Sequence, residues 1–528
     1  MTNPDLVQLA AILAAAGTAL LLAGRGRITV LGGVALLAAG EAGLVGSLSG
    51  LDRLLSPTGA AAGELGLAVA AAAAALFVRR PAWVPIAVLI AAPFRPPISF
   101  DSSGGFPLTL AEDGQLGRLL PLYFVLAVAT LALVWRALSR DGAVGAVRPL
   151  PKVITFPTVA FVGFACLSLL WADEQGPAVE LLAYFTVPFA VLIGVVARSP
   201  FPDWAPRALA RIGVALAVLF AGIGLWQAAT RELFFFAANL QASNANSDYF
   251  RVTSLFGDPS LYGRHLVLGI AILLVALALR RVNVWLGAAL IVVLWAALFF
   301  SYSQSSMTAL VAITLAIAAV TGGTRVRRLV LGGLALVVVL GVGFLASVEI
   351  RGESLRRETS DRTRRVEDTA RVVKEQPVIG VGIGGQPRAS RRLSGRDRPT
   401  PNFVSHTTPL TVAAELGTVG LLLYAWLIVG GALLIRAVWR LEPALGLTLG
   451  AVFLGLFVHA LSYSGFLEDP LTWVVLGVGT GYLSWPRRDD GTRRERLPGQ
   501  TPSEDGTGRA GGRPADDPRR ESAAPAGG

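Results

Sequence analysis

The chain has 528 residues, of which 53% are hydrophobic and only 15% are charged, and its formal net charge is +11. Soluble globular proteins carry about 25% charged residues, so this composition excludes that class and indicates an integral membrane protein. The single cysteine, Cys166, excludes an intramolecular disulfide and a cysteine-based zinc site.

Apolar stretches long enough to cross about 30 Å of hydrocarbon recur along almost the whole chain. The N-terminus carries Asp5 and lacks the basic start of a cleavable signal peptide, so we expect the first helix to be retained. The sequence predicts an all-α, polytopic membrane protein with about 15 transmembrane helices (12–15). We place them at 6–24, 28–48, 64–78, 82–94, 119–138, 153–171, 179–197, 208–228, 261–279, 283–300, 304–321, 328–348, 408–435, 443–463 and 470–485.

Basic residues collect in alternate loops, as the positive-inside rule expects of short cytoplasmic loops. The clusters are Arg25 and Arg27, Arg79 and Arg80, 136–152, Arg198 and Arg207, Arg280 and Arg281, 325–328, Arg436 and Arg440, and Arg487 and Arg488. The intervening short loops, such as 172–175 and 467–469, are acidic or nearly neutral. This alternation predicts that the N-terminus is outside and the C-terminus is cytoplasmic.

Residues 1–485 are expected to form one transmembrane domain whose outer loops, 229–260 and 349–407, form the functional site. The second of these loops is partly helical by pattern, with polar and apolar residues at helical spacing over 366–376. Residues 486–528 are rich in Pro, Gly and mixed charge, so we predict a disordered cytoplasmic tail.

The outer segment before the helix at 261–279 contains a helix-start signal, Asp258-Pro259-Ser260, between Arg251 and Arg264. Free amides at a helix N-terminus and nearby guanidinium groups both offer donors that fit phosphate oxygens. The segment is therefore a candidate anion site. The alternative is a plain interfacial loop whose arginines reach lipid head groups.

Other polar residues near the outer surface are weaker signals by themselves. The hydroxyl-rich turn at 301–306, which includes Ser303 and Gln304, can simply cap the following helix. Among the three histidines, His406 follows the long loop and could act on a phosphate or a hydroxyl, or could make a loop hydrogen bond. His265 and His459 lie within apolar runs, where neighbouring helices are expected to satisfy them.

The glycine string Pro377-Val-Ile-Gly380-Val-Gly382-Ile-Gly-Gly385 requires glycine backbone angles. It is not interpreted as a nucleotide-binding loop, because the strand before it and the helix after it are missing from the pattern. Glu415 follows inside a predicted span, where an ionisable group is expensive and is a functional candidate by default.

Taken in order, these motifs resemble the O-antigen ligase and polymerase superfamily of bacterial envelope glycosyltransferases. The resemblance covers about residues 251–420, whereas the first 200 residues match only as a succession of spans. The residues that carry it are Arg251, Gly257, Asp258-Pro259, Ser301-Tyr302-Ser303-Gln304, Pro377, Gly380, Gly382, His406 and Glu415-Leu416-Gly417.

The resemblance implies a multi-pass enzyme of the bacterial plasma membrane. It would transfer a glycan from a polyprenyl-pyrophosphate donor to a hydroxyl of a glycan or glycolipid acceptor at the outer leaflet, with inversion and without a metal or another cofactor. We expect no nucleic-acid partner. His406 would be catalytic, and Arg251, Arg264 and Arg362 would bind the pyrophosphate, supported by Asp258, Ser303, Gln304 and Glu415.

The match departs from the family at Gln304, where the family pattern has an arginine, so a non-catalytic relative stays open. A transporter or flippase of lipid-linked glycan is a second alternative, although polar residues gather at one face and the two halves show no matching symmetry. A third is another lipid-linked-sugar glycosyltransferase that relies on an outer aspartate, here Asp258. Ligation and polymerisation are not separated by the sequence.

Overall fold

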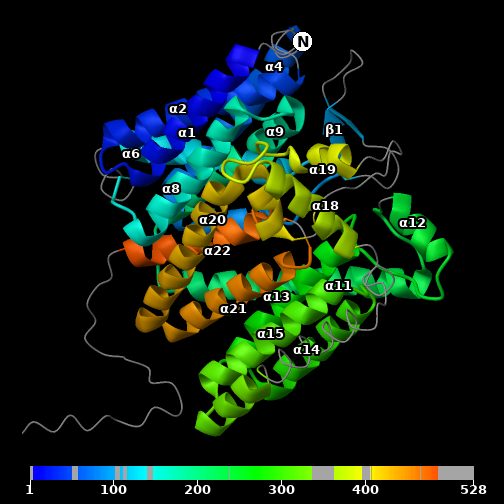
Figure 1. The fold of residues 1–528 in the computed structure, drawn as a ribbon. Helices are drawn as coiled ribbons and strands as arrows, with labels where there is room; N and C mark the ends of the chain where they lie inside the picture. Colours follow the sequence, from blue (N-terminus) through cyan, green and yellow to red (C-terminus); the bar gives the residue numbers. More distant parts are fainter. Residues whose placement is uncertain are drawn as a thin grey trace, which may run out of the picture.

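The structure is a computed structural model, and it describes residues 4–49, 57–100, 108–110, 116–139, 147–236, 238–333, 335, 362–394, 405, 407–463 and 465–485. Almost all of its regular elements are helices (Figure 1). They are α1 (Pro4–Ala23), α2 (Arg27–Ser49), α4 (Pro57–Arg79), η1 (Pro81–Trp83), α5 (Val84–Ala91), β1 (Ile98–Phe100), β2 (Leu108–Leu110), α6 (Leu120–Leu138), α8 (Lys152–Leu167), η2 (Ser168–Leu170), α9 (Gln175–Leu181), η3 (Leu182–Thr186), α10 (Val187–Ala197), α11 (Ala205–Thr230), α12 (Ala238–Ala245), α13 (Pro259–Ala278), α14 (Val284–Phe299), α15 (Gln304–Thr321), α18 (Arg362–Glu375), α19 (Gln386–Ser394), α20 (Thr408–Leu441), α21 (Pro443–Ala460) and α22 (Pro470–Ser484).

Within the described residues, 10 helices are long and apolar enough to cross a membrane, or up to 11 if a bent pair is one span. The prediction of an all-α, polytopic membrane protein is confirmed. The predicted count of about 15 spans is not shown by the described residues. The helices expected at 64–78 and 82–94 form a pair bent by 106°, because Pro81 and Pro85 cannot continue a helix in register. The helices α14 and α22 have only 16 and 15 residues. Most of the helix expected at 328–348, and the tail 486–528, lie outside the described residues.

The helices form two packed groups that meet at α21. In the first, α1 and α2 pack on α6, α8 and α10, while α20 and α22 lie between these helices and α21 (Figure 1). In the second, α13 packs against α11, α14, α15 and α21. Almost every residue of α22 is buried, which is expected of a helix that is apolar on all sides and surrounded by other helices. Glycines bring α1 and α2 close together, since a Cβ added at Gly33 would lie 2.4 Å from the Leu21 nitrogen.

Basic residues from several loops meet at one end of the first group, which we call the basic face. The buried Arg198 donates to the carbonyls of Leu21 (2.6 Å), Gly24 (3.0 Å) and Arg148 (2.8 Å). Arg148 in turn donates to the Ser484 carbonyl at the end of α22 (2.7 Å). The end of α1, the start of α8, the end of α10 and the end of α22 therefore share this face.

The opposite end, which we call the loop face, carries α18, α19, α12 and the β1–β2 hairpin, all on the right in Figure 1. The hairpin, in which Ile98 pairs with Leu110, is the one departure from an all-helical pattern in the described part of the chain. Ion pairs fasten α19 to the loop before α9: Arg388 pairs with Glu174, and Arg392 lies 3.5 Å from Asp173. The helix predicted at 366–376 is present as α18.

The glycine string interrupts α20. At Gly417 the backbone has φ 65° and ψ −165°, and this break exposes carbonyls and amides of α20 that pair with the string. The Gly382 nitrogen donates to the Glu415 carbonyl (2.9 Å), and the Thr418 nitrogen donates to the Pro377 carbonyl (2.8 Å). A Cβ at Gly417 would lie 2.2 Å from the Val378 carbonyl oxygen. Only glycine fits there.

We therefore expect Gly417→Ala to destabilise the protein by on the order of 3 kcal/mol, because it adds a backbone clash to an unfavourable φ. The measurement is the thermal unfolding midpoint of the purified protein in detergent. Gly222→Ala is the control, since Gly222 lies within α11 with nothing within 4 Å of an added Cβ. A Gly417→Ala midpoint equal to that of Gly222→Ala would contradict the assigned break.

Candidate functional site

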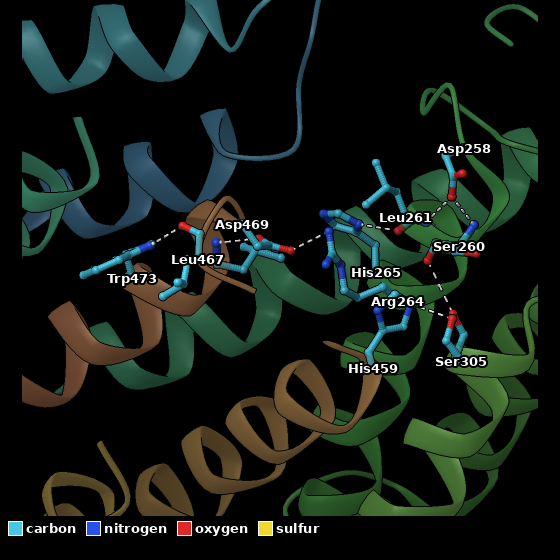
Figure 2. A network of polar contacts seen from close by, with 12 residues as sticks. Asp258, Ser260, Leu261, Arg264, His265, Ser305, His459, Leu467, Asp469 and Trp473 are labelled. Carbon is cyan, nitrogen blue, oxygen red and sulfur yellow. Dashed lines mark hydrogen bonds and ion pairs between the residues drawn. The ribbon is translucent and has the colours of Figure 1, made fainter. Parts of the chain in front are cut away.

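The helix start predicted at Asp258-Pro259 is present, and Asp258 caps it. Its carboxylate accepts hydrogen bonds from the nitrogens of Ser260 (2.6 Å) and Leu261 (3.1 Å) (Figure 2). Tyr463, from the loop between α21 and α22, also hydrogen-bonds this carboxylate. Asp258 therefore satisfies amides at the α13 N-terminus that the anion-site interpretation had left free.

Arg264, one turn further along α13, forms a buried ion pair. Its Nη2 lies 2.7 Å from Oδ2 of Asp469, and the two side chains are 7% and 2% exposed (Figure 2). Asp469 also accepts from the Leu471 nitrogen (2.8 Å) and so caps α22. A single carboxylate therefore binds α13 to the start of α22, and Arg264 is committed to it.

The prediction that neighbouring helices satisfy the two histidines within apolar runs holds for one nitrogen of His459, whereas His265 bonds within its own helix. His265 Nδ1 lies 2.8 Å from the Leu261 carbonyl, and the ring stacks on Phe256 at 4.4 Å. His459 is fully buried, and its Nε2 lies 3.1 Å from the Ser305 hydroxyl (Figure 2). The His459 contact joins α21 to α15, whereas the contact of His265 with Leu261 lies within α13.

The turn at 301–306 caps α15 through Ser303, whose hydroxyl accepts from the Ser306 nitrogen (3.3 Å). The Ser306 hydroxyl reaches the Ser260 carbonyl of α13 (3.4 Å). Gln304, at the position of the family arginine, is exposed. The turn is therefore joined to the first turn of α13 and, through Ser305, to α21.

Arg251 lies against the same turn, and its Nε donates to the Ser301 carbonyl (3.3 Å). Its terminal nitrogens bond to no residue that the structure describes, and its side chain is only partly buried. The chain after it is held by the buried Gln227 of α11, whose amide oxygen accepts from the nitrogens of Thr253 (3.1 Å) and Ser254 (2.6 Å). Arg251 is thus held by its Nε, while its terminal nitrogens have no partner among the described residues.

Sequence reasoning missed Arg95, which follows α5 at the loop face. The neighbouring ring of Phe94 packs edge-on against Phe220 (5.9 Å), whose ring also contacts His265. Arg95 interacts electrostatically with Asp469, Arg264 and Tyr463, and burial lowers its pKa. Its guanidinium makes no hydrogen bond to a described residue. The signal that could have found it is a charge at the end of a proline-broken apolar helix.

Glu468 was also missed. Burial raises its pKa, and the charge of Arg264 opposes that rise. It also interacts electrostatically with Glu415. Glu468 therefore lies between the ion pair of α13 and the glycine string, two parts of the loop face that are far apart in the sequence.

The glycine string forms the turn that the sequence predicts, with positive φ at Gly380, Gly382 and Gly384. Contrary to expectation, a helix does follow it, since α19 begins at Gln386. The carboxylate of Glu415 accepts backbone hydrogen bonds from Gly384 and Gln386. Glu415 thus caps α19, which gives this intramembrane acid a structural partner.

Two predicted residues are not placed by these contacts. His406 lies outside the described residues, and Arg362 is described only as the first residue of α18. The residues on either side of His406 are fixed. The Ser405 nitrogen donates to the Gln386 side-chain oxygen (3.2 Å), and the Thr407 hydroxyl donates to the Leu461 carbonyl (3.2 Å).

The contribution of the Arg264–Asp469 ion pair to stability can be tested by substitution. Arg264→Ala should lower the free energy of unfolding by about 3–5 kcal/mol, because it leaves a buried carboxylate without its partner. The double variant Arg264→Met/Asp469→Leu should be less destabilised than this single variant. Unfolding midpoints in detergent measure both. A stable Arg264→Ala protein would mean that Arg264 is available for a ligand.

Comparison with known proteins adds one match. A search of the curated proteins finds no match to the chain. The family model described as O-Antigen ligase (Wzy_C) matches residues 289–425, a segment that runs from α14 into α20 and includes the turn at 301–306, the glycine string and Glu415. Over residues 289–425, this multi-pass membrane protein is therefore similar to the O-antigen ligase family.

Proposed function

We propose that this protein transfers a glycan from a polyprenyl-pyrophosphate donor to a sugar hydroxyl of a glycan or glycolipid acceptor, as an O-antigen ligase-like or polysaccharide polymerase-like enzyme of cell-surface assembly. The observation that carries the proposal is that the terminal nitrogens of Arg251 and the guanidinium of Arg95 bond to no described residue, on the same face as the segment that the O-antigen ligase model matches. Pyrophosphate oxygens fit such donors.

The reaction is assigned to the outer leaflet. Basic loops are retained on the cytoplasmic side of membrane proteins, and here arginines at the start of α2, in the last turn of α6 and directly after α10 gather on the basic face. The loop face is then extracytoplasmic. With the C-terminal end of α22 on the basic face, the tail is cytoplasmic.

The chemistry follows from charge. As the acceptor oxygen attacks the anomeric carbon, the bond to the lipid pyrophosphate breaks and negative charge grows on the leaving oxygen. Guanidinium groups fixed in advance stabilise the transition state more than the bound donor, because this charge has begun to develop in the transition state. Attack opposite the leaving group inverts the anomeric centre. Nothing in this scheme requires a metal.

The proposed roles differ in part from those implied by the motifs. Arg95 joins Arg251 as a pyrophosphate-binding residue, whereas Arg264 acts as a positioning residue through its ion pair with Asp469. Arg362 keeps its proposed binding role. His406 is proposed to take the proton of the acceptor hydroxyl or to stabilise the leaving group. Asp258, Ser303 and Glu415 support the site as helix caps. Gln304 keeps its proposed supporting role.

Arg95→Ala and Arg251→Ala should each lower the rate of glycan transfer by about 10²–10³, because each removes charge stabilisation from the transition state. The assay uses purified protein, a polyprenyl-pyrophosphate-linked oligosaccharide and an acceptor glycan. Unfolding midpoints near the unsubstituted value show that the fold is intact. Arg207→Ala, an exposed arginine in the first turn of α11, is the control. Wild-type rates in both site variants would refute the assignment.

His406→Ala should lower the rate by about 10²–10⁴ and should cause lipid-linked oligosaccharide to accumulate at the outer leaflet of cells. Binding of a lectin added outside the cells shows whether that oligosaccharide is in the outer or the inner leaflet. Accumulation at the inner leaflet would point to a flippase instead. The size profile of surface polysaccharide then separates the two enzyme types, since loss of length indicates a polymerase and loss of attachment indicates a ligase.

A further inference from the structure

A pocket of about 490 Å³ opens on the basic face, away from the candidate site. It lies between the loop after α1, the start of α8 and the end of α22. Its lining residues are Arg25, Arg148, Pro149, Leu150, Pro151, Lys152, Leu483 and Ser484. Three of these are cationic and none is acidic, so the pocket is strongly electropositive.

The cations differ in how firmly they are held. Arg148 is fixed, because its Nη1 donates to the Ser484 carbonyl (2.7 Å) and its guanidinium lies 4.0 Å from the centre of the Trp485 ring. Arg25 and Lys152 are exposed and can move toward a ligand. The pocket thus has one cationic side chain that is held in place and two that can change conformation.

Further positive charge lies behind the pocket. The carbonyl of Arg148 accepts from the buried Arg198, and Arg136 donates to the Arg198 carbonyl (3.3 Å). Burial, and then the charge of Arg136, lower the pKa of Arg148 to about 10. A bound anion would favour the charged form of these arginines.

The start of α8 adds backbone donors. The residue before the helix is Pro151, which offers no side-chain cap to the first amides of this 16-residue helix. Lys152 is the first helical residue and also lines the pocket. Uncapped amides at a helix N-terminus favour an anion, and here they adjoin three cationic side chains.

We propose that this pocket binds a phosphate ester, namely the head group of an anionic phospholipid in the leaflet at the basic face. Basic pockets between transmembrane helices at the cytoplasmic surface suit such head groups. The apolar Leu150 and Leu483 offer a surface for the adjoining glycerol and acyl carbons. This site is independent of the proposed glycosyl transfer.

The test uses the purified full chain in detergent and native mass spectrometry with dioleoyl phosphatidylglycerol or dioleoyl phosphatidylcholine. We expect tighter binding of the anionic lipid. Arg25→Gln should weaken it about fivefold, and Arg25→Gln/Lys152→Gln about 25-fold, since each charge contributes roughly that factor. Arg207→Gln, which removes an exposed arginine of α11 that does not line the pocket, should change binding by less than about twofold.

Glycerol 3-phosphate distinguishes the source of the phosphate. Failure of this soluble ester to compete at millimolar concentration supports the lipid, whereas competition that the double variant abolishes supports a phosphate site filled from solution. Equal binding of the two lipids would overturn the proposal, because the anionic head group would then not be recognised. Equal weakening by Arg207→Gln and the double variant would also overturn it, because general surface charge would then explain the binding.

Discussion

The buried ion pair between Arg264 and Asp469 connects the parts of the loop face to one another. Two charges taken out of water are costly, and only a close partner with additional hydrogen bonds offsets that cost. Asp469 has both, since it also caps α22. The pair fixes the start of α13 relative to the start of α22. The loop that carries Glu468 and Tyr463 ends at this point.

A second constraint is the break of α20 at Gly417. An unbroken helix would leave no backbone groups for the glycine string, which would then have unsatisfied amides in an apolar environment. With the break, amides of the string donate to the carbonyls of Ala414 and Glu415. The Glu415 carboxylate also caps α19. The ordering of Ser405 against Gln386 depends on the same helix.

The two faces of the protein use arginine differently. On the basic face, Arg198 is fully buried and donates to carbonyls at the end of α1 and to the Arg148 carbonyl before α8, so it caps the C-terminus of α1. On the loop face, Arg264 is paired with an acid, whereas Arg95 and the terminal nitrogens of Arg251 have no hydrogen-bond partner in the described part of the chain. Residue type alone does not separate these roles, because each depends on what lies within hydrogen-bonding distance.

The sequence by itself determined the membrane class, most helix positions, the caps at Asp258 and Ser303 and the glycine turn, because hydropathy, capping and backbone preference are local properties. It also indicated a resemblance to O-antigen ligases, since the order of motifs along the chain is a sequence property. Only the tertiary structure decided that Arg264 pairs with Asp469, that Glu415 caps α19 and that Arg95 lies near Asp469 and Arg264. These depend on contacts between residues up to about 370 positions apart, and pairing over such separations follows from helix packing, which no local pattern encodes.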